Sequence, residues 1–213
     1  MFNPRFEHFK HIDFSRVPSP CYVIHMGLLE QNCRILHRVQ EQTGAKVLLA
    51  LKGFAAFSTF PLIFKYLSGT TASGLHEALL GYELFGGETH TYCPAYKPEE
   101  IEHLCRFTHT LTFNSINQWR KFRPVIQKSG RRIECGLRLN PEYSEVETEL
   151  YNPCAVGSRL GIRASQIEAS DLDGITGLHF HTMCEQNSDT LERTVEVVEE
   201  KFSKYFDRIQ WIN

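Results

Sequence analysis

One lysine of this chain stands where an amine could become reactive. Lys52 ends an apolar run, residues 46–52, and Gly53 follows it directly. Because an ammonium group at the mouth of a hydrophobic strand is costly to desolvate, its neutral amine is more accessible there than in water. A neutral amine can form an imine with an aldehyde such as pyridoxal phosphate. The alternative is a lysine that marks a strand end and extends into solvent, as most lysines do.

A second group of candidate residues lies in the segment 177–185, which contains His179, His181, Cys184 and Glu185. Two imidazoles on one strand face can share a zinc ion, so a metal site is one alternative. We do not expect a metal here, because no histidine follows His181 to complete the ligand set. His179 could have a structural role only, since inward-facing polar residues are mostly packed and hydrogen-bonded. His181 lies nearer the carboxyl end of the predicted strand and is the better functional candidate.

These side chains need a scaffold, and the chain alternates short apolar runs with amphipathic segments. Such alternation is typical of βα units around a parallel sheet. After an isolated first strand at 21–24, the predicted helices cover residues 26–41, 59–67, 76–85, 98–107, 116–129 and 188–206. The predicted strands cover residues 46–52, 69–73, 89–93, 108–114, 133–139, 175–180 and 208–212. We therefore expect an α/β protein close to a (β/α)8 barrel of the TIM type, cut short as its seventh strand opens.

Alternation along each predicted strand indicates which side chains face the barrel interior. Leu137 and Leu139 should face the helices, for example, and the residues between them the interior. Each interior-facing set ends in a polar residue at the carboxyl end of its strand, where parallel α/β proteins build active sites. We therefore expect one mouth to bring together Lys52, Arg138, Asn140 and His181. The acidic segment 141–159 should form a mobile loop at the same face.

Composition narrows the class of protein. The chain has 213 residues, of which 42% are hydrophobic, and a formal net charge of -2, which fits one globular domain. It shows no basic patch for nucleic acid, no apolar stretch of transmembrane length and no signal-peptide core at its amino end. Its seven cysteines are odd in number, scattered and without a Cys-x-x-Cys pair. Reduced thiols in the cytoplasm explain them better than disulfides or structural zinc.

Several stretches of the chain carry motifs of a known family, at residues 17–23, 49–53, 71–77, 152–153 with 157–161, and 177–185. They resemble the carboxynorspermidine (carboxyspermidine) decarboxylases, pyridoxal-phosphate enzymes of fold type III, a group that includes ornithine and diaminopimelate decarboxylases. The lysine motif alone indicates only this wider group. The histidine pair followed by Cys184 and Glu185 points to the carboxynorspermidine enzymes in particular.

The resemblance implies a role for each matching residue. Lys52 corresponds to the lysine that holds pyridoxal phosphate covalently, and His181 to the histidine that stacks on the cofactor ring. Arg138 resembles the arginine near the cofactor's phenolic oxygen. Glu77 resembles a carboxylate that positions neighbouring polar groups. Cys184 stands where relatives often have a serine that touches the phosphate.

The resemblance also implies how the protein is organised. Residues 1–24 would pair with a carboxyl-terminal β-domain, and residues 25–213 would form an incomplete cofactor-binding barrel. The expected reaction is decarboxylation of carboxynorspermidine or carboxyspermidine to norspermidine or spermidine, in polyamine biosynthesis and by a homodimer. Because family members continue with a phosphate loop and the β-domain, we expect residues 1–213 alone to be inactive. The alternatives are a non-catalytic pyridoxal-phosphate carrier and another fold-type III enzyme such as diaminopimelate decarboxylase.

Overall fold

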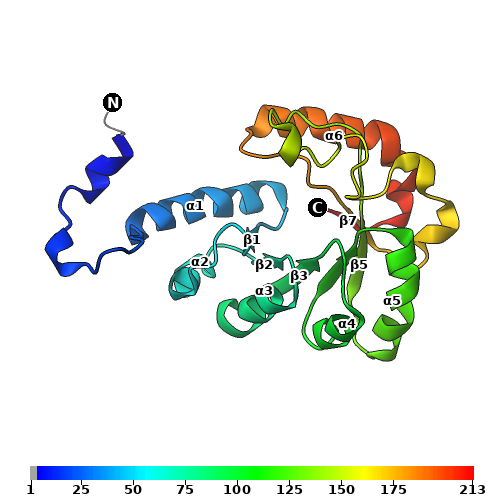
Figure 1. The fold of residues 1–213 in the computed structure, drawn as a ribbon, viewed down its shortest axis with the longest axis horizontal. Coiled ribbons are helices and arrows are strands. Elements are labelled where there is room, and N and C mark those ends of the chain that lie inside the picture. The colour runs from blue at the N-terminus through cyan, green and yellow to red at the C-terminus, as the bar shows by residue number, and fades with distance from the viewer. Residues whose placement is uncertain (1–3) are drawn as a thin grey trace.

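The computed structural model describes residues 4–213, and a curled parallel sheet forms the centre of this part of the chain (Figure 1). The strands are paired in chain order, each parallel to the next. They are β1 (Leu48–Ala50), β2 (Gly69–Ala72), β3 (Glu88–Tyr92), β4 (Thr110–Phe113), β5 (Glu134–Arg138), β6 (Gly177–His179) and β7 (Trp211–Ile212). Sequential parallel order with the helices outside is the arrangement of a (β/α) barrel wall, so the predicted fold class is confirmed.

The helices alternate with these strands and lie around the outside of the curled sheet (Figure 1). They are α1 (Met26–Thr43), α2 (Phe60–Ile63), α3 (Leu75–Leu80), α4 (Pro98–Leu104), α5 (Ile116–Lys128) and α6 (Ser188–Phe202). All of them except α1 end before the predicted residue. A π-helical turn, Gly81–Phe85, follows α3. Gly81 lies against Thr70 of β2 so closely that a Cβ would overlap with the threonine hydroxyl, which explains glycine at this position.

One predicted element is wrong. Residues 21–24 were expected to form an isolated first strand, but the structure assigns them no strand. A strand exists through hydrogen bonds to a neighbour, and these residues pair with nothing in the part of the chain that the structure describes. Residues 4–25 instead contain two short 3-10 helices, Pro4–Phe9 and Phe14–Arg16, at the end of α1 that is remote from the sheet (Figure 1).

The main apolar core lies between the sheet and its helices. Leu111, Leu137 and Leu178 are 0% exposed on three successive strands, and Leu104 and Phe202 are 0% exposed on the helices α4 and α6. The helix-facing side of the strands is therefore apolar, as their alternation predicted. Burial of this kind contributes roughly 1.5–3 kcal/mol for each large side chain.

The opposite side of the sheet has small and polar side chains. Gly136 and Gly177 face inward, as predicted, and the indole ring of Trp211 fills the space above both glycines. The Trp211 ring nitrogen donates hydrogen bonds to Glu134 and Thr176, each over 3.2 Å. Within residues 4–213, no helix is both long and apolar enough to cross a membrane.

Candidate active site

Lys52 lies in the turn that follows β1, two residues beyond the end of the strand. The turn is closed by hydrogen bonds from the amides of Gly53 and Phe54 to the carbonyl of Ala50, at 3.0 and 3.1 Å. Leu51 is buried, but the Lys52 side chain is exposed, so burial alone does not make its amine reactive as the sequence suggested. The Lys52 Nζ atom lies 3.2 Å from Nε2 of His181, which is 129 positions away in the chain. Two residues predicted to meet at one mouth are therefore in direct contact.

The imidazole of His181 is uncharged at neutral pH. Desolvation and the nearby charges of Lys52 and Arg138 lower the pKa of His181 to about 4. A neutral imidazole with its proton on Nδ1 accepts a hydrogen bond at Nε2. His181 is thus placed to accept the N–H of a Lys52 ammonium, and it is the group nearest to that proton.

Arg138, the last residue of β5, places a positive charge inside the protein. Arg138 is only 4% exposed, and a guanidinium stays protonated when it is buried. Nη1 donates to the Tyr92 hydroxyl oxygen over 2.6 Å, and Nη2 donates to the His181 carbonyl over 3.1 Å. Both partners are neutral, and residues 4–213 offer Arg138 no carboxylate partner. The buried charge is therefore available to an anion that enters the site.

Tyr92 and His179 form the floor of the same region. Their rings stack with centroids 5.2 Å apart and planes at 27°. Desolvation lowers the pKa of His179 to about 4, and its Nδ1 hydrogen-bonds Oδ1 of Asn213. The sequence analysis did not single out Tyr92. Its place at the carboxyl end of β3 could have identified it, because the rule that selected Arg138 applies equally to that strand.

A cavity of about 820 Å³ opens over these residues and is lined by Lys52, Tyr92, Arg138, His179 and His181. One wall is largely apolar and includes Leu150, Tyr151, Pro153, Leu160 and Met183. A volume of this size accommodates a cofactor together with a small substrate. The combination of apolar walls with a few convergent polar groups is typical of ligand sites in parallel α/β proteins.

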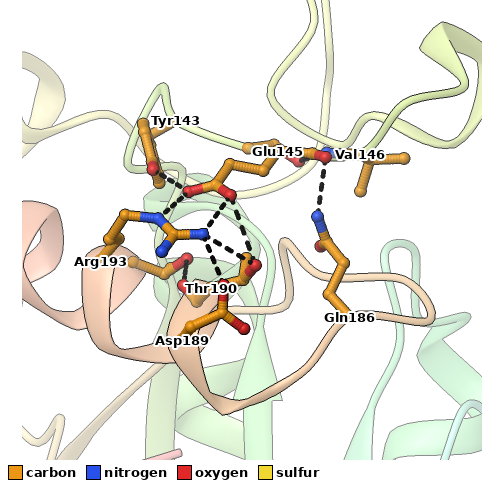
Figure 2. A network of polar contacts seen from close by, with 9 residues as sticks. Tyr143, Glu145, Val146, Gln186, Asp189, Thr190 and Arg193 are labelled. Carbon is orange, nitrogen blue, oxygen red and sulfur yellow. Dashed lines mark hydrogen bonds and ion pairs between the residues drawn. The ribbon is translucent and has the colours of Figure 1, made fainter.

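Three residues of this wall, Leu150, Tyr151 and Pro153, belong to the acidic loop 141–159, which is tied to the start of α6 (Figure 2). Glu145 accepts hydrogen bonds from Nε and Nη2 of Arg193, at 2.6 and 2.7 Å, and its backbone carbonyl accepts one from Gln186 over 2.7 Å. Hydrogen bonds from Arg193 and then from Tyr143 lower the pKa of Glu145 to about 2. The expected mobile loop thus has a specific attachment to the element that follows β6.

The other predicted site residues are placed differently. Cys184 is exposed at the cavity wall. Glu77 does not line the cavity; its Oε2 accepts a hydrogen bond from the amide of Ser73, over 2.7 Å, and Ser73 does line it. This arrangement is compatible with an indirect, positioning role. Within residues 4–213, no group of three or more His, Cys, Asp or Glu side chains could hold a metal ion.

The expectation that Asn140 shares the mouth with Lys52 is wrong. Asn140 lines a separate cavity of about 490 Å³ beside the start of α5. Beyond β5 the backbone pairs with Ile162, whose amide donates to the Arg138 carbonyl and whose carbonyl accepts from the Asn140 amide, each over 2.9 Å. Beyond β5 the chain thus has a neighbour outside the seven strands, the loop segment around Ile162, and Asn140 and Ile162 line the same separate cavity.

Comparison with known proteins gives the following relatives. No protein-family model matches the chain. It is 44% identical over 200 residues to the carboxynorspermidine/carboxyspermidine decarboxylase of Campylobacter jejuni, covering 94% of this chain and 51% of that protein. It is 43% identical over 199 residues to the carboxyaminopropylagmatine decarboxylase of Synechocystis sp., covering 93% of this chain and 51% of that protein. The chain thus spans about half the length of these relatives.

Solved structures agree with this relationship. The carboxynorspermidine decarboxylase of Campylobacter jejuni, complexed with norspermidine, superposes with a TM-score of 0.82 at 41% identity, over 92% of this chain and 50% of that one. The diaminopimelate decarboxylase of Helicobacter pylori, complexed with L-lysine, gives a TM-score of 0.77 at 14% identity over 93% of this chain and 54% of that one, a likeness of fold alone. The resemblance predicted from the sequence is therefore confirmed: over nearly all of its length, the chain matches the amino-terminal half of the carboxynorspermidine/carboxyspermidine decarboxylases.

Proposed function

We propose that this chain forms the pyridoxal-phosphate-binding barrel of an enzyme that decarboxylates carboxynorspermidine or carboxyspermidine to norspermidine or spermidine. The observation that carries the proposal is the contact between Lys52 and the neutral imidazole of His181, in a cavity bordered by a buried guanidinium. An amine beside a proton acceptor suits an aldehyde, and an uncompensated buried cation suits an anionic ring substituent. The identity to decarboxylases of this class supports the same assignment.

The residues present fit this cofactor. Lys52 would bind its aldehyde carbon, His181 would lie against its ring, and Arg138 would face its anionic phenolic oxygen. Cys184 would contact the phosphate, and Glu77 would act through the Ser73 amide. When bound, pyridoxal phosphate supplies the electron sink into which the substrate loses CO2. The chain's own contribution is to orient the ring, to receive the lysine proton at His181 Nε2 and to limit water with the apolar wall.

The substrate class follows from the relatives and from the cavity. The Campylobacter structure was solved with norspermidine, and the Synechocystis relative acts on a carboxyaminopropyl derivative of agmatine. Carboxynorspermidine and carboxyaminopropylagmatine, which the names of these relatives contain, are both long aliphatic amines with a carboxyl group. The apolar wall formed by Leu150, Tyr151 and Met183 is suited to the methylene segments of such a molecule. We expect the enzyme to act in the cytoplasm as a homodimer.

A substrate panel tests the proposal. The full-length gene product is purified and incubated with pyridoxal phosphate and, separately, with carboxynorspermidine, carboxyspermidine, diaminopimelate or ornithine, and CO2 release is measured. The proposal predicts release from a carboxy-triamine and none from the Lys52→Ala variant. Release from diaminopimelate in preference to the triamines would contradict the substrate class. Cofactor binding without any release would support instead the alternative of a non-catalytic pyridoxal-phosphate carrier.

A further inference from the structure

We propose that Tyr92 is a positioning residue for Arg138: its hydroxyl holds the guanidinium at the cavity wall without neutralising it, so that the positive charge remains for the anionic oxygen of the bound cofactor. This inference deepens the proposed function and rests on it. Tyr92 is not assigned a role by any motif of the sequence, and it touches Arg138, His179 and Asn114 at once.

The hydroxyl of Tyr92 has a single consistent hydrogen-bond arrangement. A guanidinium can only donate, so the Tyr92 oxygen accepts from Arg138 Nη1 over 2.6 Å. The phenol proton is then free to be donated to Oδ1 of Asn114, over 2.8 Å. The aromatic ring adds a second contact, because the Arg138 guanidinium carbon lies 4.8 Å from its centroid. Tyr92 therefore restrains the Arg138 guanidinium through two contacts, one from its hydroxyl and one from its ring.

Asn114 fixes the tyrosine in turn. Its Oδ1 accepts from the amide of Gly161 over 2.9 Å, and its Nδ2 donates to the carbonyl of Arg159 over 2.7 Å. Oδ1 of Asn114 thus faces a donor and Nδ2 faces an acceptor. Exchanging these two atoms by flipping the side-chain amide would lose both hydrogen bonds. The tyrosine hydroxyl is thus held by the backbone of the segment after β5 as well as by Arg138.

The chemistry of a phenol explains why this residue suits the position. A carboxylate in its place would form an ion pair with Arg138 and cancel the charge that the site needs. Desolvation raises the pKa of Tyr92 despite the nearby Arg138, so the phenol stays neutral. The ring also stacks on His179, which packs Tyr92 against β6. Tyr92 thus gives the guanidinium an acceptor and a fixed place while leaving its charge intact.

The substitution Tyr92→Phe tests the inference, because it removes the oxygen and keeps the ring. Two properties are measured: the dissociation constant of pyridoxal phosphate, and the pH midpoint of the absorbance change of the bound cofactor. A nearby cation lowers the pKa of an acid, so a displaced Arg138 should raise this midpoint. We expect the midpoint to rise in Tyr92→Phe, by less than in Arg138→Gln, and cofactor binding to weaken about tenfold.

A double-variant comparison separates positioning from a general structural effect. If Tyr92 acts through Arg138, Tyr92→Phe should add nothing to the midpoint shift in an Arg138→Gln background. Tyr82→Phe is the matched control, since Tyr82 is exposed, stacks on Phe107 and lies outside the cavity. It should leave the midpoint and the dissociation constant unchanged. Equal shifts in Tyr82→Phe, or additive shifts in the double variant, would overturn the inference.

A cofactor-free measurement checks the contact itself. In protein labelled with carbon-13 on the tyrosine rings, Arg138→Gln should move the Tyr92 resonance, while Arg123→Gln, on α5 and outside the cavity, should not. An unmoved Tyr92 resonance would overturn the inference whatever the cofactor does. If wild-type protein binds no pyridoxal phosphate, the proposed function and this inference fail together. If the wild type binds it and Tyr92→Phe behaves identically, the inference alone fails.

Discussion

The charged side chains at the two ends of the strands have opposite surroundings. At the amino end, Lys46 pairs with Glu88, and Glu88 also accepts from His90 over 2.9 Å. Although desolvation raises the pKa of Glu88, hydrogen bonds from Lys46 and His90 outweigh it and lower the pKa overall. At the carboxyl end, Lys52 and Arg138 contact only neutral groups among residues 4–213. At the amino end the charged side chains pair with opposite charges. At the carboxyl end the two cations have no anionic partner among residues 4–213.

The difference separates stability from function. A charge that already has its partner contributes to folding and offers nothing to a ligand. A buried guanidinium without an anion carries a desolvation cost that a bound anion would offset, so it is kept where a ligand supplies the missing charge. On this comparison, substitutions at the amino end should change stability, and substitutions at the carboxyl end should change cofactor binding.

The largest expected effect is at Arg138. Arg138→Gln removes the buried charge and leaves the Tyr92 oxygen without its donor, so pyridoxal-phosphate binding should weaken by about a hundredfold. The measurement is an equilibrium titration followed by cofactor absorbance. Arg123→Gln is the control, because that guanidinium lies over the Trp119 ring outside the cavity and should leave binding unchanged. Wild-type affinity in Arg138→Gln would mean that the unpaired charge has no part in binding.

The next effect separates the two histidines of the β6 segment. His181→Ala should weaken cofactor binding by about tenfold, because it removes the group beside Lys52 and the proposed stacking surface. His179→Ala should have a smaller effect, since His179 contacts Tyr92 and Asn213 at the floor of the site. The same titration compares them. A greater loss of cofactor affinity in His179→Ala than in His181→Ala would show that the cofactor ring lies against His179 and not against His181.

A change at the amino end should have the converse effect. Glu88→Gln removes the charge between Lys46 and His90 and should lower the free energy of unfolding by about 1 kcal/mol, with unchanged cofactor affinity. Because the folded-state pKa of Glu88 is lowered, its contribution is present above the carboxyl's ordinary pKa and is lost as pH falls below it. Denaturant unfolding at several pH values measures this. Loss of cofactor affinity in Glu88→Gln would contradict the assignment of the amino end to stability and the carboxyl end to cofactor binding.

The smallest expected effect concerns the loop attachment shown in Figure 2. Glu145→Gln should weaken the bidentate contact with Arg193 and speed chymotrypsin cleavage at Tyr151 without unfolding the protein. The pKa of Glu145 is lowered to about 2, so the attachment should hold at neutral pH and weaken as pH falls through the range from the ordinary carboxyl pKa toward 2. Glu147→Gln, an exposed change in the same loop, should leave the cleavage rate unchanged.

Strand alternation predicted much of this site, and its failures have physical causes. It placed Arg138 and His179 inside because the pleat continues to the strand end in β5 and β6, whereas His181, also predicted to face inward, lies two residues beyond β6. It failed for Asn140, which lies beyond the end of β5, where the backbone pairs with Ile162 of a loop. The segment 21–24 has strand-like residues but no partner to define a strand in the described chain.

The electrostatic environment was the least predictable part. Strand alternation predicted that Lys52 and His181 share one mouth, but no sequence pattern shows that Arg138 has neutral partners there. These contacts join residues at least 43 positions apart. The apolar run before Lys52 suggested a buried amine, whereas the structure leaves the lysine exposed and places the proton acceptor in the segment that follows β6. The carboxyl-end rule could have identified Tyr92, but only the assembled sheet shows that its hydroxyl contacts Arg138.

The most direct test of the account is to identify the lysine that binds the cofactor. Purified protein is mixed with pyridoxal phosphate and reduced with borohydride, and the labelled peptide is then sequenced. The account predicts that the label lies on Lys52 and disappears in Lys52→Ala, while Lys46→Ala and Lys65→Ala are labelled like the wild type. Label on Lys46 or Lys65, or undiminished label in Lys52→Ala, would contradict the assignment of this cavity as the cofactor site.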